Sequence, residues 1–174
     1  MRLAALAVLC SALACATARP RPSLGDIQLR PYEDIQAVPH VFSVQDGRIL
    51  SPDLDVSIDE QGCALGVFGR EPLQLCNKAQ KGEPSEPGGK VEHWAGSGGD
   101  LTLELLDKGK SLRVDGFLNV SGRGTMPLQT TLPLGQGPKW DELRKHPVLA
   151  AVAAAVAGVR GEPDPYSRSG VSEK

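Results

Sequence analysis

Two of the four cysteines of this chain have a spacing that predicts chemistry. Cys63 and Cys76 lie in a segment that also contains a turn signal, and Cys10 and Cys15 lie in an apolar N-terminal run. In an oxidising compartment an even pair of cysteines favours a structural disulfide. A pair without further Cys or His residues at metal-ligand spacing favours neither redox catalysis nor a zinc site. We therefore predict a Cys63–Cys76 disulfide.

The segment between these two cysteines predicts a hairpin with a defined register. The Gly-Arg pair at 69–70 suits a two-residue type II′ turn. Counting outward from that turn places Cys63 opposite Cys76, in a pair without backbone hydrogen bonds. Pro72 falls in the same kind of pair, where its missing N–H costs the hairpin nothing. Cα atoms approach closely at such positions, so a disulfide fits, and it should stabilise the fold by about 2–3 kcal/mol.

Carboxylates gather on another predicted strand. Asp53, Asp55 and Asp59 lie along one strand face and its end, and their oxygens form a candidate calcium site. Calcium, however, takes six to eight oxygens that converge from a loop, and a flat strand face spreads them apart. A solvated acidic face is therefore the favoured interpretation. The three histidines are scattered singly, so no metal and no other cofactor is predicted.

The chain contains no motif that favours an enzyme. No serine lies in a G-x-S-x-G elbow, and the Gly-Lys-Ser at 109–111 lacks the upstream glycine of a phosphate-binding loop. A hydrolase with an unusual site is an alternative, and it would need His93 or His146 within reach of a carboxylate in a cleft. The charge is nearly balanced, with 19 Lys and Arg against 21 Asp and Glu. Such a surface has no basic footprint, so nucleic acid is not expected as a partner.

The N-terminus predicts export. Arg2 precedes an apolar run at residues 3–14, whose length fits the core of a signal peptide and is too short to span a bilayer. Two cleavage sites are open. The small residues at 16–18 suit a standard signal peptidase that cuts before Arg19, which would make residues 1–18 the signal peptide. The second site lies directly before Cys15.

Residues 12–15, Ala-Leu-Ala-Cys, resemble the lipobox of bacterial lipoprotein precursors. They depart from the usual pattern at Ala12, where Leu is common, and at Leu13, where a small residue is common. The resemblance covers the signal region alone. It implies that residues 1–14 are removed and that Cys15 is diacylated, which anchors the chain stably in a membrane. The residue after the cysteine is Ala16 and not the Asp that typically retains such lipoproteins in the inner membrane. The resemblance therefore implies a location in the outer membrane.

Period-two alternation dominates the rest of the chain and predicts a mainly β (α+β) fold. Residues 53–59 alternate strictly, and two further runs are separated by a turn at 107–110. We expect an antiparallel meander sheet with a C-terminal helix packed on it and one disulfide-stapled hairpin. The predicted organisation is a lipidated tether and lead-in at 15–36, a single domain at 37–159 with an exposed, flexible loop at 78–90, and a disordered tail at 160–174.

The period changes near the end of the domain. Residues 140–146 predict a short helical turn, and Pro147 suits the first position of a second helix over 147–159 that ends near Gly158. This helix would be about 20 Å long, against about 30 Å for a bilayer core. We therefore expect it to close the open face of the sheet, with one narrow stripe of Leu and Val facing inward.

These features together predict a non-enzymatic exported lipoprotein. We expect an envelope-anchored binding or accessory module that contacts another protein or an envelope polymer, bound to the membrane through its lipid. Two alternatives are open. The chain could carry an apolar ligand in a cavity between sheet and helix. It could also be a soluble secreted protein, if cleavage occurs before Arg19.

Overall fold

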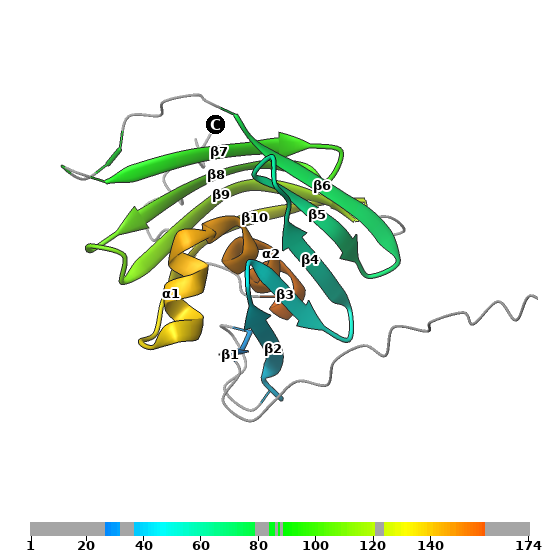
Figure 1. Cartoon of the computed structure of the whole chain (residues 1–174), viewed down its shortest axis with the longest axis horizontal. Helices are drawn as coiled ribbons and strands as arrows, with labels where there is room; N and C mark the ends of the chain where they lie inside the picture. The colour runs from blue at the N-terminus through cyan, green and yellow to red at the C-terminus, as the bar shows by residue number, and fades with distance from the viewer. Residues whose placement is uncertain are drawn as a thin grey trace, which may run out of the picture.

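The computed structural model describes residues 27–31, 37–78, 84, 85, 87, 89–120 and 124–158. Ten strands form one antiparallel meander in which each strand pairs with the next along the chain, and two helices follow (Figure 1). The elements are β1 (Ile27–Leu29), β2 (His40–Gln45), β3 (Arg48–Ser51), β4 (Leu54–Ile58), β5 (Cys63–Phe68), β6 (Glu71–Lys78), β7 (Lys90–Gly96), β8 (Gly99–Leu106), β9 (Ser111–Val120), β10 (Gly124–Pro133), α1 (Pro138–Lys145) and α2 (Pro147–Ala157). The mainly β meander predicted from the sequence is confirmed.

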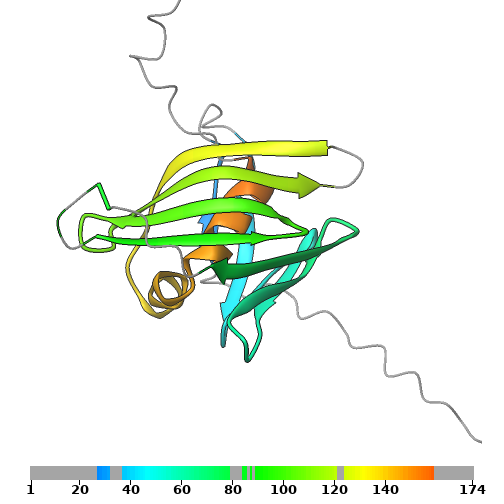
Figure 2. The ribbon, with the colours of Figure 1, turned by 90° about the horizontal axis from the view of Figure 1, so that it is seen from above.

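The sheet is curled, and its inner face packs against α2 (Figure 2). Alternate residues of each strand point inward, because side chains alternate between the two faces of a sheet. In β4, Leu54 and Val56 are buried, whereas Asp55 between them is half-buried on the outer face. In β8, Leu101 and Leu103 are buried in the same way. The aliphatic alternation read from the sequence therefore corresponds to the inner face.

Helix α2 fills the space inside the curl. It begins at Pro147 and ends at Gly158, which adopts the left-handed conformation (φ 67°) that glycine accepts without strain. Every residue of α2 except Val156 is buried, and residues 148–154 have no exposed surface. The expected single stripe of Leu and Val is therefore wrong. The alanines are buried as well, because the sheet surrounds the helix instead of lying on one side of it.

Glycines allow the strands to curl this tightly. Gly116 in β9 has a φ of 139°, and a Cβ atom there would lie 2.1 Å from the Asp100 carbonyl oxygen of β8. Gly66 in β5 is in similar contact, since its Cβ would lie 1.9 Å from the Asp55 carbonyl oxygen. Side chains at either position would push the neighbouring strand away, so the curvature depends on glycine.

Helix α1 ties two distant hairpins together. On one side, the Lys139 ammonium donates to the Val44 carbonyl at 2.7 Å, and the Gly47 N–H donates to Glu142 Oε1 at 2.8 Å. On the other side, the Arg144 guanidinium donates to the Gly109 carbonyl at 2.7 Å. Gly47 belongs to the β2–β3 turn and Gly109 to the β8–β9 turn. The helix thus bridges the β2–β3 hairpin and the β8–β9 hairpin.

The Glu142 carboxylate makes this bridge sensitive to acid. Partial burial acts to raise its pKa, but the hydrogen bond from Gly47 and the positive side chains of Lys145 and His146 outweigh that effect, so the pKa lies below the ordinary 4.5. The ionised carboxylate therefore adds stability that is fully present above pH 4.5 and is lost as pH falls through the lower pKa of the folded state.

We expect Glu142→Gln to be less stable than wild type by about 1 kcal/mol near neutral pH, because the charge of the acceptor is lost while its hydrogen bond remains possible. This difference should shrink as the pH falls below 4.5, since the wild-type carboxylate is then neutral as well. Urea unfolding of both proteins across that pH range measures it. A difference that stays constant down to acid pH would contradict the assignment.

One segment differs from the organisation that the sequence predicts. β1 (Ile27–Leu29) lies in the stretch assigned to the tether and lead-in, yet it pairs with β2, and Ile27 and Leu29 are buried. Three residues are too few to show an alternating pattern in the sequence. The strand forms because Ile27 and Leu29 pack in the core.

Residues 1–14, Cys15 and 160–174 lie outside the described residues. None of the described helices has the length and apolar character needed to cross a bilayer.

Candidate functional site

The predicted disulfide is present at the predicted register. Cys63 Sγ and Cys76 Sγ are 2.10 Å apart, and the two Cα atoms are 4.2 Å apart. Val67 pairs with Pro72, as counting from the 69–70 turn requires. Both sulfurs lie on the outer face of the sheet, because the neighbouring Ala64 and Leu75 are buried on the inner face. Cys15 lies outside the described residues.

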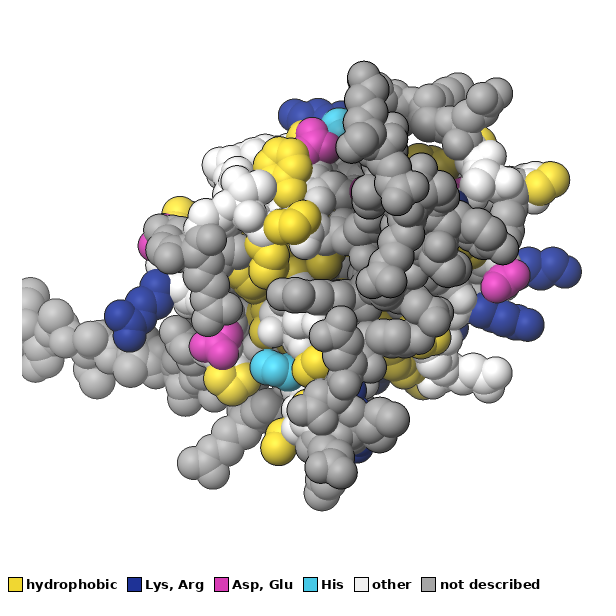
Figure 3. All heavy atoms as spheres, turned by 180° about the vertical axis from the view of Figure 1, so that it is seen from behind, with side chains coloured by type: hydrophobic (Ala, Val, Ile, Leu, Met, Phe, Trp, Pro, Cys, Tyr) yellow, Lys and Arg dark blue, Asp and Glu magenta, His cyan; other side chains and the backbone are white. Residues whose placement is uncertain are grey.

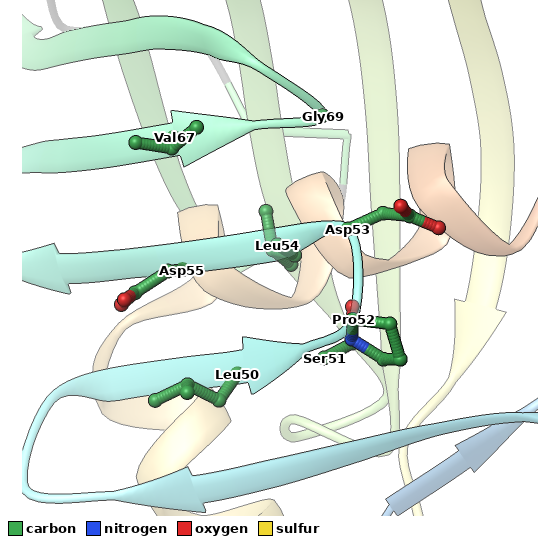
Figure 4. Close-up of a pocket in the computed structure, with 8 residues that line it drawn as sticks. All are labelled: Leu50, Ser51, Pro52, Asp53, Leu54, Asp55, Val67 and Gly69. Atoms are coloured by element: carbon green, nitrogen blue, oxygen red, sulfur yellow. The ribbon is translucent and has the colours of Figure 1, made fainter. Parts of the chain in front are cut away.

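Two of the three aspartates of the candidate calcium site bind other partners. Asp55 receives two hydrogen bonds from the Arg48 guanidinium, at 2.9 and 2.8 Å, which raise the pKa of Arg48. Asp59 accepts the N–H groups of Gln61 and Cys63 and so stabilises its own turn. Asp53 and Asp55 point in opposite directions (Figure 4). Within the described ranges, no group of three or more His, Cys, Asp or Glu residues is arranged to hold a metal ion.

A shallow recess lies beside the β3–β4 turn (Figure 4). Its volume of about 10 Å³ is room for a single water molecule. Leu50 and Val67 supply apolar walls, and Ser51 contributes a buried hydroxyl without a hydrogen-bond partner among the described residues. A recess of this size cannot enclose an organic substrate. It can at most accept the tip of one side chain.

Two histidines lie beside carboxylates, as a hydrolase would require. His93 Nε2 is 2.8 Å from Asp100 Oδ1, and His146 Nε2 is 3.8 Å from Glu142 Oε1. His93 stands on the outer face of β7, where its Nδ1 is buried without a hydrogen-bond partner among the described residues. A general base must reach the proton that it removes. The buried Nδ1 cannot reach a bound substrate, and the Nε2 is engaged with Asp100.

Two buried carboxylates were not anticipated from the sequence. Glu92, on the inner face of β7, accepts the indole N–H of Trp94 at 2.9 Å and pairs with Lys90 at 2.6 Å. The i, i+2 spacing of these residues on one strand is the signal that could have revealed this pairing. Because each oxygen has a partner, Glu92 supports the fold at this end of the sheet instead of offering a free carboxylate.

The second buried carboxylate, Glu104, holds part of the loop before β7. Glu104 accepts hydrogen bonds from the N–H and the hydroxyl of Ser85, both at 2.6 Å to Oε1, and Arg113 lies 3.2 Å from its other oxygen. Ser85, within the 78–90 loop, is therefore held at the outer face of β8 and β9.

The outer face carries one row of side chains with apolar character. Strand register places these residues side by side across six neighbouring strands, β5 to β10, and Phe117 and Pro127 are exposed. Hydrophobic side chains also reach the surface on the side seen in Figure 3, among polar and charged ones. We call this set the outer row: Cys63, Cys76, Ala95, Asp100, Phe117 and Pro127.

The outer row presents an exposed aromatic side chain at the surface of the sheet. Phe117 exposes 38% of its surface although it lies in the middle of a regular strand. Exposed aromatic side chains are enriched at interaction sites. The one charged member, Asp100, is paired with His93, which lowers the free-energy cost of burying its carboxylate under a partner.

Comparison with known proteins identifies no family: no family model, curated protein or solved structure matches this chain.

Proposed function

We propose that this chain is a non-enzymatic, exported lipoprotein whose outer row binds another protein of the cell envelope. The single observation that carries the binding proposal is the exposed Phe117, beside Pro127, on a sheet whose opposite face is filled. Helix α2 occupies the place where an internal ligand would lie, so the outer surface is what remains for recognition. Aromatic anchors surrounded by polar side chains are typical of such interfaces.

The proposed location is the outer membrane, to which a lipid on Cys15 would anchor the protein. The support is the apolar run at 3–14, the resemblance of residues 12–15 to a lipobox, and a disulfide, which persists in an oxidising compartment. An enclosing compartment and a lipid anchor would together keep the outer row close to other envelope proteins. A soluble secreted protein, cut before Arg19, is the competing proposal.

Intact mass of the mature protein tests the address. We expect wild type from the membrane fraction of a bacterial host to start at Cys15 and to carry acyl mass. The Cys10→Ser variant should behave identically, because that residue leaves with the signal peptide, whereas Cys15→Ser should carry no acyl mass. Chains that start at Arg19 in all three preparations, found in the soluble fraction, would establish the secreted form instead.

Site-specific photo-crosslinking in the envelope tests the binding surface. A photoreactive phenylalanine analogue at Phe117 should form a discrete adduct with an envelope protein. The matched control is the same analogue at Val67, which is 40% exposed on another part of the outer face. Equal adducts at both positions would argue against the outer row, and an adduct with a glycan polymer alone would identify the partner as an envelope polymer.

The alternative of an apolar-ligand carrier needs space that α2 now takes. Leu149 and Val152 have no exposed surface and pack within the same core as the sheet. A carrier of this kind would have to move the helix or bind elsewhere. We therefore place surface recognition ahead of it.

A further inference from the structure

Strand β6 changes its partner at one residue. It pairs with β5 from Glu71 to Cys76, and it pairs with β7 only at Cys76, Asn77 and Lys78. Cys76 is thus the residue of β6 that belongs to both ladders, and in Figure 1 β6 runs from one part of the sheet to the other. We call these three pairs with β7 the joint, because they connect β1–β6 to β7–β10.

The joint is a short ladder of three pairs, like the ladders of β1 with β2 and of β2 with β3. Among the described residues, one further backbone hydrogen bond crosses it, from the Gly98 N–H to the Gln74 carbonyl at 3.0 Å. The ladder of β8 with β9, in contrast, runs the whole length of β8. Short ladders open more readily than long ones, because fewer hydrogen bonds must break together. Helix α2 packs against strands on both sides of the joint, so opening it would uncover α2.

The disulfide connects the joint to Cys63, whose backbone is held by hydrogen bonds with Asp59. The Cys63 N–H donates to Asp59 Oδ1 at 2.8 Å, and the Asp59 N–H donates to the Cys63 carbonyl at 2.9 Å. The Cys63 backbone is therefore held by its own turn. Because Cys76 is bonded to Cys63, the point at which β6 crosses to β7 is held too. The Cys63–Cys76 pair is the last pair of the β5–β6 ladder, at the end away from the 69–70 turn.

We propose that the Cys63–Cys76 disulfide is a redox-dependent lock on the joint, closed when oxidised and open when reduced. In the oxidised chain the two parts of the sheet curl as one around α2. In the reduced chain the end of β6 separates from β7 and part of α2 becomes accessible. This inference does not rest on the proposed binding partner or on the lipid.

The opening step is a thiol–disulfide exchange with a dithiol reductant. One thiolate of the reductant attacks a cystine sulfur, the S–S bond breaks, and a mixed disulfide forms. The second thiolate of the reductant then displaces the other cysteine. Two electrons pass from the reductant, which becomes a disulfide, and both cysteine thiolates take up a proton. Oxidation by a disulfide-bearing oxidoreductase reverses these steps.

Hydrogen exchange on the folded protein measures the joint directly. Oxidised wild type is compared with the same protein reduced by dithiothreitol, with intact mass confirming the reduction. We expect the amides of residues 74–78 and 93–98 to exchange roughly tenfold faster or more after reduction, with the β8–β9 ladder little changed. No change at the joint, or equal acceleration throughout the chain, would overturn the proposal.

A disulfide moved to another strand pair distinguishes a specific effect on the joint from a general stabilisation of the fold. Asp115 and Gln129 form a β9–β10 pair on the outer face, two positions from the Phe117–Pro127 pair. Pro127 has no N–H, so its pair is one without backbone hydrogen bonds, and the Asp115–Gln129 pair is of the same kind. Cysteines there, in a Cys63→Ala, Cys76→Ala background, enclose a loop one residue longer than the native separation of 13. The loss of chain entropy in the unfolded state is therefore matched.

We expect the relocated disulfide to recover the melting temperature that the double alanine variant loses, while residues 74–78 and 93–98 remain fast in exchange. Slow exchange at the joint in the relocated variant would show that any staple suffices, and the lock would be rejected. If the alanine background does not fold, the comparison of oxidised and reduced wild type decides the question alone.

Discussion

Replacing Gly116 by alanine is expected to lower the free energy of unfolding by about 3 kcal/mol or more. Two physical effects add at this position. The φ of 139° is one that residues with a Cβ atom rarely adopt, and the new Cβ would lie 2.1 Å from the Asp100 carbonyl oxygen. The clash is with backbone, so no side-chain rotation relieves it. Either β9 moves away from β8 or the local curl is lost.

The control for this substitution is Gly124→Ala. Gly124 also has a positive φ, of 76°, but a Cβ there would meet no atom of the described residues within 4 Å. This variant therefore carries the conformational cost without the clash, and we expect it to lose about 1 kcal/mol. Urea unfolding of the two variants separates the effects. Equal losses would mean that the close approach of β9 to β8 contributes nothing to stability.

The second large effect is expected from Leu149→Ala in α2. Leu149 has no exposed surface and is surrounded by the inner face of the sheet, so truncation leaves a cavity and should cost about 3 kcal/mol. Alanine is the better helix former, so helix propensity cannot account for a loss. The measured cost therefore reports packing inside the curl.

Val156→Ala on the same helix is the matched comparison. Val156 is the one residue of α2 that is not fully buried, and its truncation should cost about 1 kcal/mol or less. Thermal and urea unfolding of both variants give the ratio. If Leu149→Ala costs no more than Val156→Ala, the sheet adjusts around α2 and the core is not closely packed.

Local rules predicted one part of this molecule to the residue. The turn at 69–70 and the alternation on either side of it place Cys63 opposite Cys76, and the structure has that pair. The same kind of reasoning predicted that α2 begins at Pro147 and ends near Gly158, and the helix runs from Pro147 to Ala157 with Gly158 as its C-cap. In both cases the information lies within a few residues of the feature.

Other parts depend on contacts between distant segments, which a single sequence does not contain. The change of partner at Cys76 depends on how far the sheet curls. The three residues of β1 are held by packing. Glu104 is buried because Ser85, far away in the chain, satisfies it. The outer row likewise depends on the register of six neighbouring strands, and pairs between strands of different hairpins are not fixed by the local pattern of either strand.

The order of the elements along the chain has a consequence for biosynthesis. The walls of the core begin at β1, but the element that fills it, α2, comes after all ten strands. A nascent chain that lacks α2 has an apolar inner face with nothing to cover it, so its curled sheet cannot be stable before the helix has been made. Such a chain stays extensible until α2 has been made. That delay would suit a polypeptide that has to pass through a narrow channel before it acquires its shape.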